Sequence, residues 1–451
     1  MFKKFTNVCV KLVQRFLPDP FIFCAVLTLA VFLLGIVLTG QTPLSMVIHW
    51  GKGFWSLLSF AMQMALVLVF GHVLASAPAF KKFLSRLADI PKTPGQSIVV
   101  VSVVALIACW INWGFGLVIG AIFAKEIAKK VKDVDYRLLI ASAYSGFLIW
   151  HQGLSGSIPL TIASGGETVR KLTQGVIDGP IPTSETIFHP VILLTSLALL
   201  VFIPLVNRAM HPDPEHTVSF VPPEVANISD DDAVALTPAD KMEKGPLFSV
   251  LIAIMGFVYI VYYFSTNGFL LNLDIVNFIF LMTGIALHKT PRSYLNAMAE
   301  AVKGAGGILL QFPFYAGIAA MMVGANAEGL SVGGLFSSAF VSVSTEFTFP
   351  LFAFLSAGLV NFFVPSGGGQ WAVQAPIILP AAQNIGVHPA VASMAIAFGD
   401  AWTNMIQPFW ALPALGIAGL GARDIMGYCI VDLIVSGIIM GAGIILFGMF
   451  V

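Results

Sequence analysis

The sequence predicts an all-α polytopic membrane protein with two inverted-topology repeats, re-entrant hairpins and broken helices. Apolar residues make up 57% of the 451 residues and charged residues only 10%, and the mean hydropathy is +0.90. Apolar segments as long as a spanning helix recur along the chain. Gly, Pro and Asn interrupt some of these segments at positions that correspond between the two halves.

The composition excludes several broad classes. So few charges cannot cover a soluble fold of this size, which disfavours a soluble enzyme, a nucleic-acid binder and a disordered scaffold. The formal net charge is 0, so no basic field attracts nucleic acid. The four cysteines have no paired spacing and indicate neither a disulfide framework nor a metal site. The apolar run from Pro20 to Leu38 is too long for the core of a cleaved signal, so it is the first span.

Apolar segments of roughly 20 residues are candidate spanning helices. They cover residues 20–39, 54–76, 138–163, 188–207, 246–265, 274–288, 305–323, 387–412 and 426–450. The stretches 96–124 and 345–386 are apolar but interrupted. A polar segment from His211 to Lys244 indicates a solvated linker. We therefore divide the chain into a first membrane repeat (1–210), a polar cytoplasmic linker (211–245) and a second membrane repeat (246–451).

The Lys and Arg residues predict the orientation, because basic loops remain on the cytoplasmic side. If the basic stretches 81–92 and 125–137 are both inside, the segment between them must be a re-entrant hairpin. Adding the N-terminal residues, the linker, loop 289–303 and Arg423 places 20 of the 23 Lys and Arg residues inside. Only Lys52, Arg170 and Lys171 then lie outside. The N-terminus is expected in the cytoplasm and the C-terminus in the periplasm.

An internal repeat supports the same architecture. Three residue pairs share one separation of 249 residues: Asn112 with Asn361, Pro159 with Pro408, and Gly120 with Gly369. The charge pattern independently places the two copies on opposite sides of the membrane. Inverted repeats with helices broken near the midplane are a design of secondary transporters, so the fold is ion-transporter-like. The alternative is chance matches between two Gly-rich apolar stretches.

The helix breaks are the candidate binding elements. Lipid cannot satisfy the free N–H groups of a broken helix, so a break must face protein, water or ligand. The spans carry no Lys or Arg at mid-depth, which leaves helix N-termini to bind a carboxylate. The expected substrate-binding residues are Asn112, Ser155, Gly156, Ser157, Asn361, Ser366, Gly367, Gly368, Gly369, Gln370, Thr403 and Asn404. The alternative is that Gly and Ser only permit close helix packing.

Two ionisable residues lie just before breaks, and ionisable groups inside a membrane are costly. His151 and Asp400 are separated by the same 249 residues, so they occupy equivalent positions. Either could carry a proton, and we take both as coupling-ion residues. Asp400 could instead bind sodium together with nearby side-chain oxygens. Those ligands would be Asn361, Thr403 and Asn404. The alternative is a pair of buried groups satisfied by hydrogen bonds.

Six stretches spread over nearly the whole chain are together more specific than any single motif. They are LPDPFIF, GFWSLLSFAMQMALVL, INWGFGLVIGA, GLSGSIPL, VNFFVPSGGGQW and QPFWALPALGIAGLGARDIMGYC. These stretches resemble the bacterial short-chain fatty acid transporter family, the type associated with acetoacetate and butyrate uptake. The resemblance implies inner-membrane uptake of short monocarboxylates and kinship with ion transporters that use paired re-entrant hairpins.

We therefore expect a secondary transporter for short-chain fatty acids, coupled to a proton or sodium ion, and no enzyme activity. Tryptophans that flank the breaks could cover the alkyl tail of the substrate. An anion channel or exchanger is the alternative, although a channel would need a continuous polar pore. An intramembrane enzyme would need a Ser/His pair at one depth. Ser155 and His151 are four residues apart, but the break between them argues against a shared helix face.

The expected partners are a small carboxylate and the lipid bilayer, and no nucleic acid. We expect no organic cofactor and no metal site, with H⁺ or Na⁺ as the coupling ion. No GxxxxGK[ST] motif indicates ATP-driven transport. The oligomeric state stays open, with a homodimer as one arrangement, because transporters with such repeats are often dimers.

Overall fold

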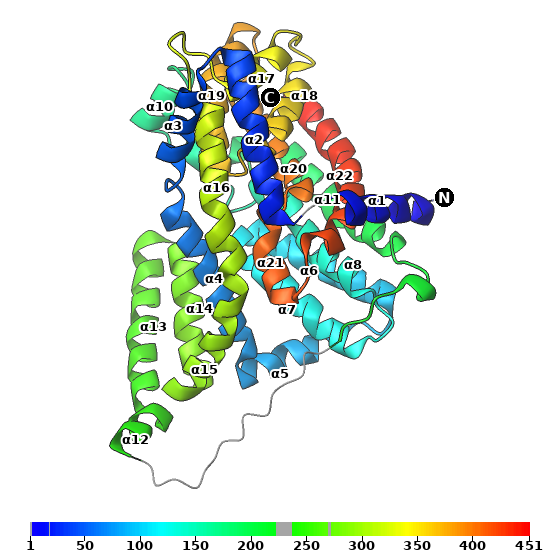
Figure 1. Ribbon diagram of the computed structural model, residues 1–451, viewed down its shortest axis with the longest axis vertical. Helices are drawn as coiled ribbons and strands as arrows, with labels where there is room; N and C mark the ends of the chain where they lie inside the picture. Colours follow the sequence, from blue (N-terminus) through cyan, green and yellow to red (C-terminus); the bar gives the residue numbers. More distant parts are fainter. Residues whose placement is uncertain (1, 18, 222–236, 269–271) are drawn as a thin grey trace.

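The computed structural model describes residues 2–17, 19–221, 237–268 and 272–451, and these residues form helices and no strand. The helices of the first half are α1 (Phe2–Phe16), α2 (Pro20–Thr39), α3 (Pro43–Gly53), α4 (Leu58–Ser76), α5 (Pro78–Leu87), α6 (Pro94–Ile111), α7 (Trp113–Lys130), α8 (Tyr136–Tyr144), η1 (Ser145–Gln152), α9 (Ser157–Ser164), α10 (Glu167–Leu172), η2 (Thr183–Glu185) and α11 (Pro190–Ala209). Those that follow are η3 (Pro214–His216), α12 (Pro238–Lys244), α13 (Leu247–Asn267), α14 (Leu273–His288), α15 (Pro291–Val302), η4 (Lys303–Ala305), α16 (Gly306–Val323), α17 (Val332–Val341), α18 (Phe349–Asn361), α19 (Gly367–Asn384), α20 (Pro389–Thr403), η5 (Asn404–Ile406), α21 (Ala411–Ala418) and α22 (Ala422–Phe450). Within the described residues, six helices are long and apolar enough to cross a membrane. The predicted all-α polytopic class is confirmed (Figure 1).

The segment predicted as a re-entrant hairpin forms α6 and α7, which meet at Asn112. The Asn112 side chain caps α7 by accepting a backbone N–H of its first turn at 2.9 Å. Gly116 lets the two helices approach closely, because an added Cβ would lie 2.5 Å from the Cys109 backbone nitrogen. At the opposite end, Lys130 forms a 2.6 Å ion pair with Asp89, just before α6. Both ends of the hairpin therefore lie together, as a re-entrant segment requires.

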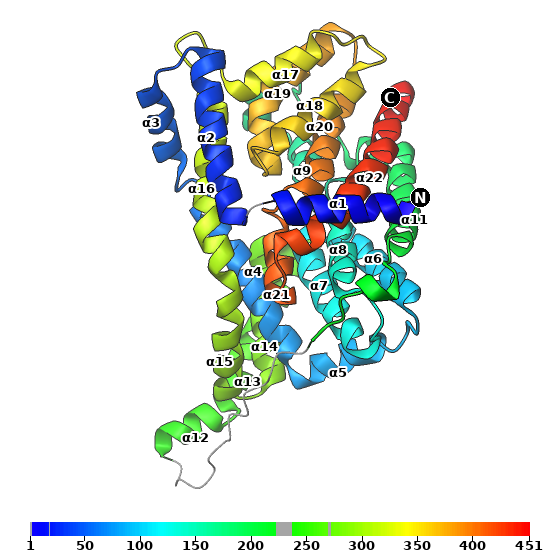
Figure 2. The ribbon, with the colours of Figure 1, turned by 45° about the vertical axis from the view of Figure 1, so that its right-hand side comes forward.

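The second half contains a corresponding hairpin and, like the first half, a broken helix. Helices α18 and α19 form the hairpin, with residues 362–366 at its tip. The broken helices are α8, η1 and α9 in the first half, and α20, η5 and α21 in the second (Figure 2). Each hairpin tip contacts the break that follows it: the Leu154 N–H donates to the Trp110 carbonyl at 2.7 Å, and the Asn361 amide donates to Thr403 at 3.0 Å. The inverted relation between the two halves stays a prediction.

Several helices were not predicted from the sequence. Helix α1 is amphipathic and packs across the start of α22, where Gly427 allows the backbone of Val10 to approach. The loop expected at 289–303 instead forms α15 and η4 and leads directly into α16. Both segments are short and, on average, too polar for a membrane span, so a search for long apolar runs passes over them.

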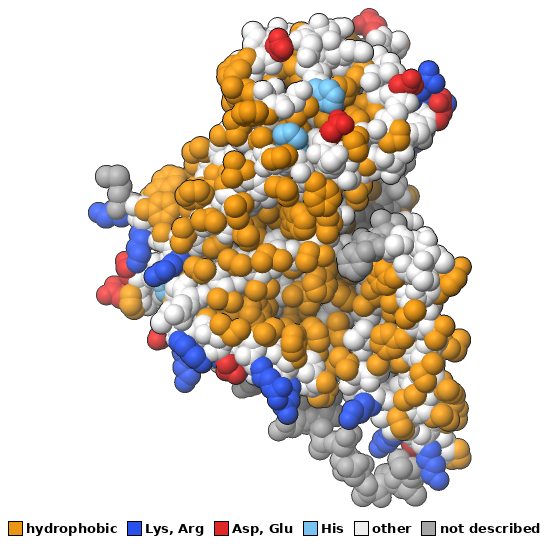
Figure 3. Space-filling view, turned by 180° about the vertical axis from the view of Figure 1, so that it is seen from behind, with side chains coloured by type: hydrophobic (Ala, Val, Ile, Leu, Met, Phe, Trp, Pro, Cys, Tyr) orange, Lys and Arg blue, Asp and Glu red, His pale blue; other side chains and the backbone are white. Residues whose placement is uncertain are grey.

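Contacts bring together the loops that were predicted to be cytoplasmic. They are the ion pair of Lys3 with Asp213 at 2.9 Å, the ion pair of Arg292 with Glu243, and the bond from Arg423 to the Leu17 carbonyl. The hydrogen bond from Lys3 lowers the pKa of the Asp213 carboxyl. Figure 3 shows Lys and Arg side chains gathered along one edge of the molecule, beside a broad apolar surface. These contacts agree with a common face for the basic loops.

A separate set of contacts joins the loops that were predicted to lie outside. The contacts are Asn326 to the Thr39 carbonyl at 2.8 Å, Gln41 to the Gly324 carbonyl at 2.9 Å, and Gln174 to the Pro376 carbonyl at 2.9 Å.

Residues 222–236 of the predicted linker lie outside the described residues. The part before them is held against the first half, because the Val218 N–H donates to the Asp135 carboxylate at 2.9 Å. The part after them forms α12, whose first turn is closed by a capping box between Thr237 and Asp240.

Candidate functional site

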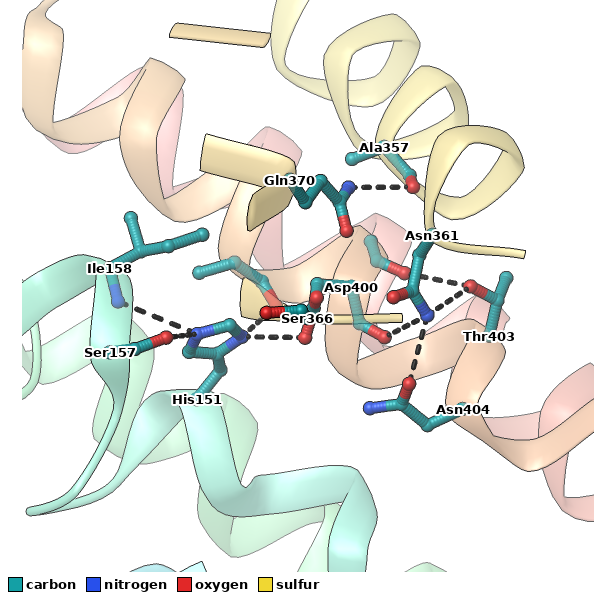
Figure 4. Close-up of polar contacts among 12 residues, drawn as sticks. His151, Ser157, Ile158, Ala357, Asn361, Ser366, Gln370, Asp400, Thr403 and Asn404 are labelled. Atoms are coloured by element: carbon teal, nitrogen blue, oxygen red, sulfur yellow. Dashed lines mark hydrogen bonds and ion pairs between the residues drawn. The ribbon is translucent and has the colours of Figure 1, made fainter. Parts of the chain in front are cut away.

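The two broken helices cross at a buried histidine–aspartate pair. Nδ1 of His151, near the end of η1, lies 3.0 Å from Oδ2 of Asp400 on α20 (Figure 4). The two side chains are 0% and 1% exposed. Trp150 stacks on the imidazole with ring centroids 3.6 Å apart. The sequence analysis placed these residues at equivalent positions, and the structure places them in direct contact.

The neighbours of His151 determine where its proton lies. Nδ1 faces two acceptors, the Asp400 carboxylate and the Ala397 carbonyl at 3.1 Å. Nε2 faces the Ser157 hydroxyl at 2.9 Å and the Ile158 N–H at 3.5 Å. Because a backbone N–H can only donate, the neutral ring carries its proton on Nδ1 and accepts at Nε2. A second proton would turn Nε2 into a donor and give the ring a positive charge beside the carboxylate.

Two helix N-termini meet next to this pair. Helix α9 begins at Ser157, after Gly156, and α19 begins at Gly367, after its cap Ser366. An added Cβ on Gly367 would lie 2.3 Å from the Ser157 hydroxyl oxygen and 2.7 Å from the His151 ring. Gly368 is exposed, and a Cβ added there would have nothing within 4 Å. The first N–H groups of a helix have no intrahelical acceptor, so this junction presents donors and two positive dipole ends.

Asn361, at the end of α18, ties the second hairpin to the second broken helix. Its amide donates to the Asp400 carbonyl at 2.8 Å, to Thr403 at 3.0 Å and to Asn404 at 2.9 Å. The Tyr144 hydroxyl donates to the Asn404 carbonyl at 2.7 Å and links this group to α8. The arrangement holds the backbone around Asp400 in place from two sides.

Several buried polar atoms around the pair form no hydrogen bond among the described residues. They are Oδ1 and Oδ2 of Asp400, Oδ1 of Asn361, Oε1 of Gln370 and Nδ2 of Asn404. The Asp400 carboxylate lies at ion-pair distance from His151 but without hydrogen-bond alignment. Burying polar atoms without a hydrogen-bond partner is costly, so this group of atoms is a candidate binding position.

Other predicted site residues serve the hairpin tips. Ser155 accepts the Trp113 N–H at 3.0 Å, which joins the first hairpin, capped by Asn112, to the first break. The Thr403 hydroxyl donates to the Gly358 carbonyl at 2.9 Å. These groups are engaged within the scaffold and lie beside the junction rather than forming it.

Gln370 and Gly369 belong to the first turn of α19. The Gln370 amide donates to the Ala357 carbonyl and to Gln374, both at 2.8 Å, which fixes α19 against α18. The Gly369 N–H lies 3.4 Å from the Ser366 hydroxyl. The cap at Ser366 and the amide of Gln370 thus set the direction in which the α19 N-terminus points.

An aromatic cluster lies between the two breaks. Trp113 contacts Trp410 and Trp150 with ring centroids 5.0 and 5.9 Å apart, and Phe147 stacks on Trp150 at 5.4 Å. The sequence analysis considered tryptophans as a cover for an alkyl tail, but it did not single out Phe147 or Tyr144. Their spacing of four and seven residues before His151 is the signal that could have found them.

Comparisons with known proteins agree along the whole chain. A family model described as short chain fatty acid transporter matches residues 1–447. A relative from Escherichia coli (strain K12) that carries the name of a short-chain fatty acid transporter is 45% identical over 99% of this chain and 100% of its own length. A relative of the same name from Haemophilus influenzae is 45% identical over 98% of this chain and 99% of its own. Among solved structures, the Alcanivorax borkumensis YdaH transporter has a TM-score of 0.43 and 17% identity, covering 96% of this chain and 98% of that chain.

Proposed function

Because the chain belongs to the short-chain fatty acid transporter family, we propose that it takes up short monocarboxylates such as butyrate or acetoacetate by coupled secondary transport. The substrate carboxylate binds between the N-termini of α9 and α19, and its tail turns toward Trp150 and the aromatic cluster. The His151–Asp400 pair carries the coupling ion, which is H⁺ or Na⁺. The meeting of two helix N-termini beside a buried ionisable pair is the observation that carries this proposal.

We place the protein in the bacterial cytoplasmic membrane, with the basic face inside. The contacts among the basic loops and the distribution of 20 of 23 Lys and Arg residues support this orientation. Helix α22 starts beside Leu17 on the basic face. Near its other end, Gly448 lies close to Pro350 on the opposite face. The N-terminus is then cytoplasmic and the C-terminus periplasmic.

Uptake by the purified protein in proteoliposomes tests the proposal. Labelled butyrate or acetoacetate should accumulate above equilibrium when one gradient, proton or sodium, is imposed, and that gradient identifies the coupling ion. Protein-free liposomes under the same gradients are the control, because protonated short acids cross lipid unaided. Equilibration without accumulation would favour the channel or exchanger alternative. No protein-dependent flux of either acid would overturn the assignment.

One observation favours a second candidate function, an acyl hydrolase. Ser157, His151 and Asp400 lie in the order of a hydrolytic triad, with contacts of 2.9 and 3.0 Å and Ser157 at a helix N-terminus. The Ser157 oxygen would attack an ester or thioester carbonyl while Nε2 takes its proton; Nε2 would then give the proton to the departing alcohol or thiol, and water would hydrolyse the acyl-Ser157 ester to release the acid. A fluorophosphonate probe separates the two functions. Transport alone predicts no covalent labelling, whereas a hydrolase predicts labelling that Ser157→Ala abolishes.

A further inference from the structure

A buried carboxylate without an ion-pair partner among the described residues lies outside the proposed substrate junction. Asp432 is in the membrane-spanning helix α22, and its carboxyl group faces the Asn207 carboxamide on α11. That carboxamide also contacts Ser102 on α6 and Ser145 on η1, and all four residues are 0% exposed. An ionised carboxylate is costly to bury inside a membrane, so the charge state of Asp432 depends on the groups around it.

The Asn207 carboxamide lies between Asp432 and the two serines. Its Nδ2 atom lies 3.0 Å from the Ser102 hydroxyl oxygen and 2.9 Å from that of Ser145. Its other polar atom lies 3.1 and 3.2 Å from the two carboxyl oxygens of Asp432. Each serine hydroxyl also lies 2.9 or 2.8 Å from a backbone carbonyl one turn earlier, to which it can donate.

This cluster has two self-consistent hydrogen-bond arrangements. When the serines donate to the backbone, they accept from the Asn207 NH₂ group, and the amide oxygen faces Asp432. An oxygen facing an oxygen requires a proton between them, so Asp432 is then a neutral acid. When the carboxamide is turned over, its NH₂ group donates to both Asp432 oxygens and its oxygen accepts from the serines. That second arrangement matches an ionised carboxylate.

Among the described residues, no cationic side chain forms an ion pair with Asp432. Cys429, one turn earlier on α22, interacts with it electrostatically. The other titratable or charged side chains on α22 and on the elements packed against it are Arg423, Asp424, Tyr428, Lys3, Lys4, Cys9, Lys11, Arg15, Tyr136, Arg137, Tyr144, His151, Arg208 and Asp400. An isolated buried carboxylate avoids the cost of desolvation by becoming neutral.

We propose that Asp432 is a proton-binding site inside the membrane, and that the orientation of the Asn207 carboxamide follows its protonation. The bound proton donates to the Asn207 oxygen. Its release leaves a carboxylate, and the amide turns so that its NH₂ group faces the negative charge. The site is independent of the proposed substrate junction, although Ser145 and His151 both belong to η1.

Infrared spectroscopy of the full chain in lipid tests this directly. At neutral pH the wild type should show the carbonyl band of a protonated carboxyl group, shifted by D₂O, and Asp432→Asn should lose that contribution. Asn207→Ala should keep the band but shift it, because the acceptor of the acid proton is gone. Asp400→Asn and Asp135→Asn identify any contribution from the two other buried aspartates, Asp400 and Asp135. Ser436→Ala is the matched control, since this buried serine on α22 bonds only within its helix.

The measurement needs no substrate, so it remains informative if the transport proposal fails. An identical carbonyl region in wild type and Asp432→Asn would show an ionised Asp432 and overturn the proposal. If the band is lost when NaCl is added at constant pH, sodium displaces the proton from Asp432, and this result would also overturn the proposal. If Asp432→Asn does not fold, the band shift expected in Asn207→Ala still tests the proposal, and an unshifted band would overturn it.

Discussion

Asp400→Asn and His151→Gln should each abolish gradient-driven accumulation of substrate, with a loss of roughly 100-fold. Such a loss corresponds to about 2.7 kcal/mol, somewhat below the cost of leaving a buried charge without its partner. The 3.0 Å contact and the complete burial of both side chains are the physical reason. Each substitution keeps the approximate shape of the side chain but removes the group that can exchange a proton or bind a cation.

Exchange of substrate separates a coupling role of the His151–Asp400 pair from a purely structural one, in which exchange would be lost together with accumulation. If the pair acts in coupling, exchange of internal for external substrate should persist in both variants, because exchange does not require the coupling ion to be released. The double variant should be no worse than either single one, since the two residues act as one unit.

Asp178→Asn is the matched control for the aspartate. Asp178 forms an exposed ion pair with Arg170, with side chains 74% and 59% exposed, and such pairs contribute little. Its uptake should equal that of the wild type. Normal accumulation in Asp400→Asn would remove this residue from the coupling mechanism.

Gly367→Ala should reduce uptake at least roughly tenfold while the protein still reaches the membrane. The added methyl group would overlap the Ser157 hydroxyl and the His151 ring, at 2.3 and 2.7 Å. Relieving overpacking of this kind costs about 1–3 kcal/mol, and here it must push the α19 N-terminus away from α9. Since the proposed carboxylate site lies between these two ends, the KM for substrate should rise more than the maximal rate falls.

Gly306→Ala is the control for this substitution. Gly306 begins another membrane helix, α16, and has nothing within 4 Å of an added Cβ. This variant should show wild-type kinetics. An unchanged KM in Gly367→Ala would mean that the carboxylate binds elsewhere, whatever happens to the maximal rate.

Much of the fold could be predicted because its signals are local. The transfer of apolar side chains into lipid determines where spans lie, and α2, α11 and α13 lie within about two residues of the predicted segments. Likewise, the breaks follow from Gly, Pro and Asn, which change the backbone within one turn. Asn112 therefore marked the hairpin tip correctly.

The candidate site could be predicted only in part. The predicted breaks in the two halves carried similar residues, so the residue pattern offered no reason to prefer one of them as the binding junction. The structure uses Asn112 and Ser155 to close the first hairpin, and it brings Gly367 of the second hairpin against Ser157 of the first half. Which break forms the junction depends on how whole helices pack against one another. A short stretch of sequence carries no information about that packing.

By itself, then, the sequence determined the membrane class and the helix breaks, because solvation and backbone sterics act over a few residues; the sidedness of the loops stays a prediction. Only the tertiary structure decided which distant groups meet. His151 and Asp400 lie 249 residues apart, and Asp432 finds Asn207 and two serines from three other elements. These pairings arise because buried polar groups must find partners across packed helices, and packing is a property of the whole chain.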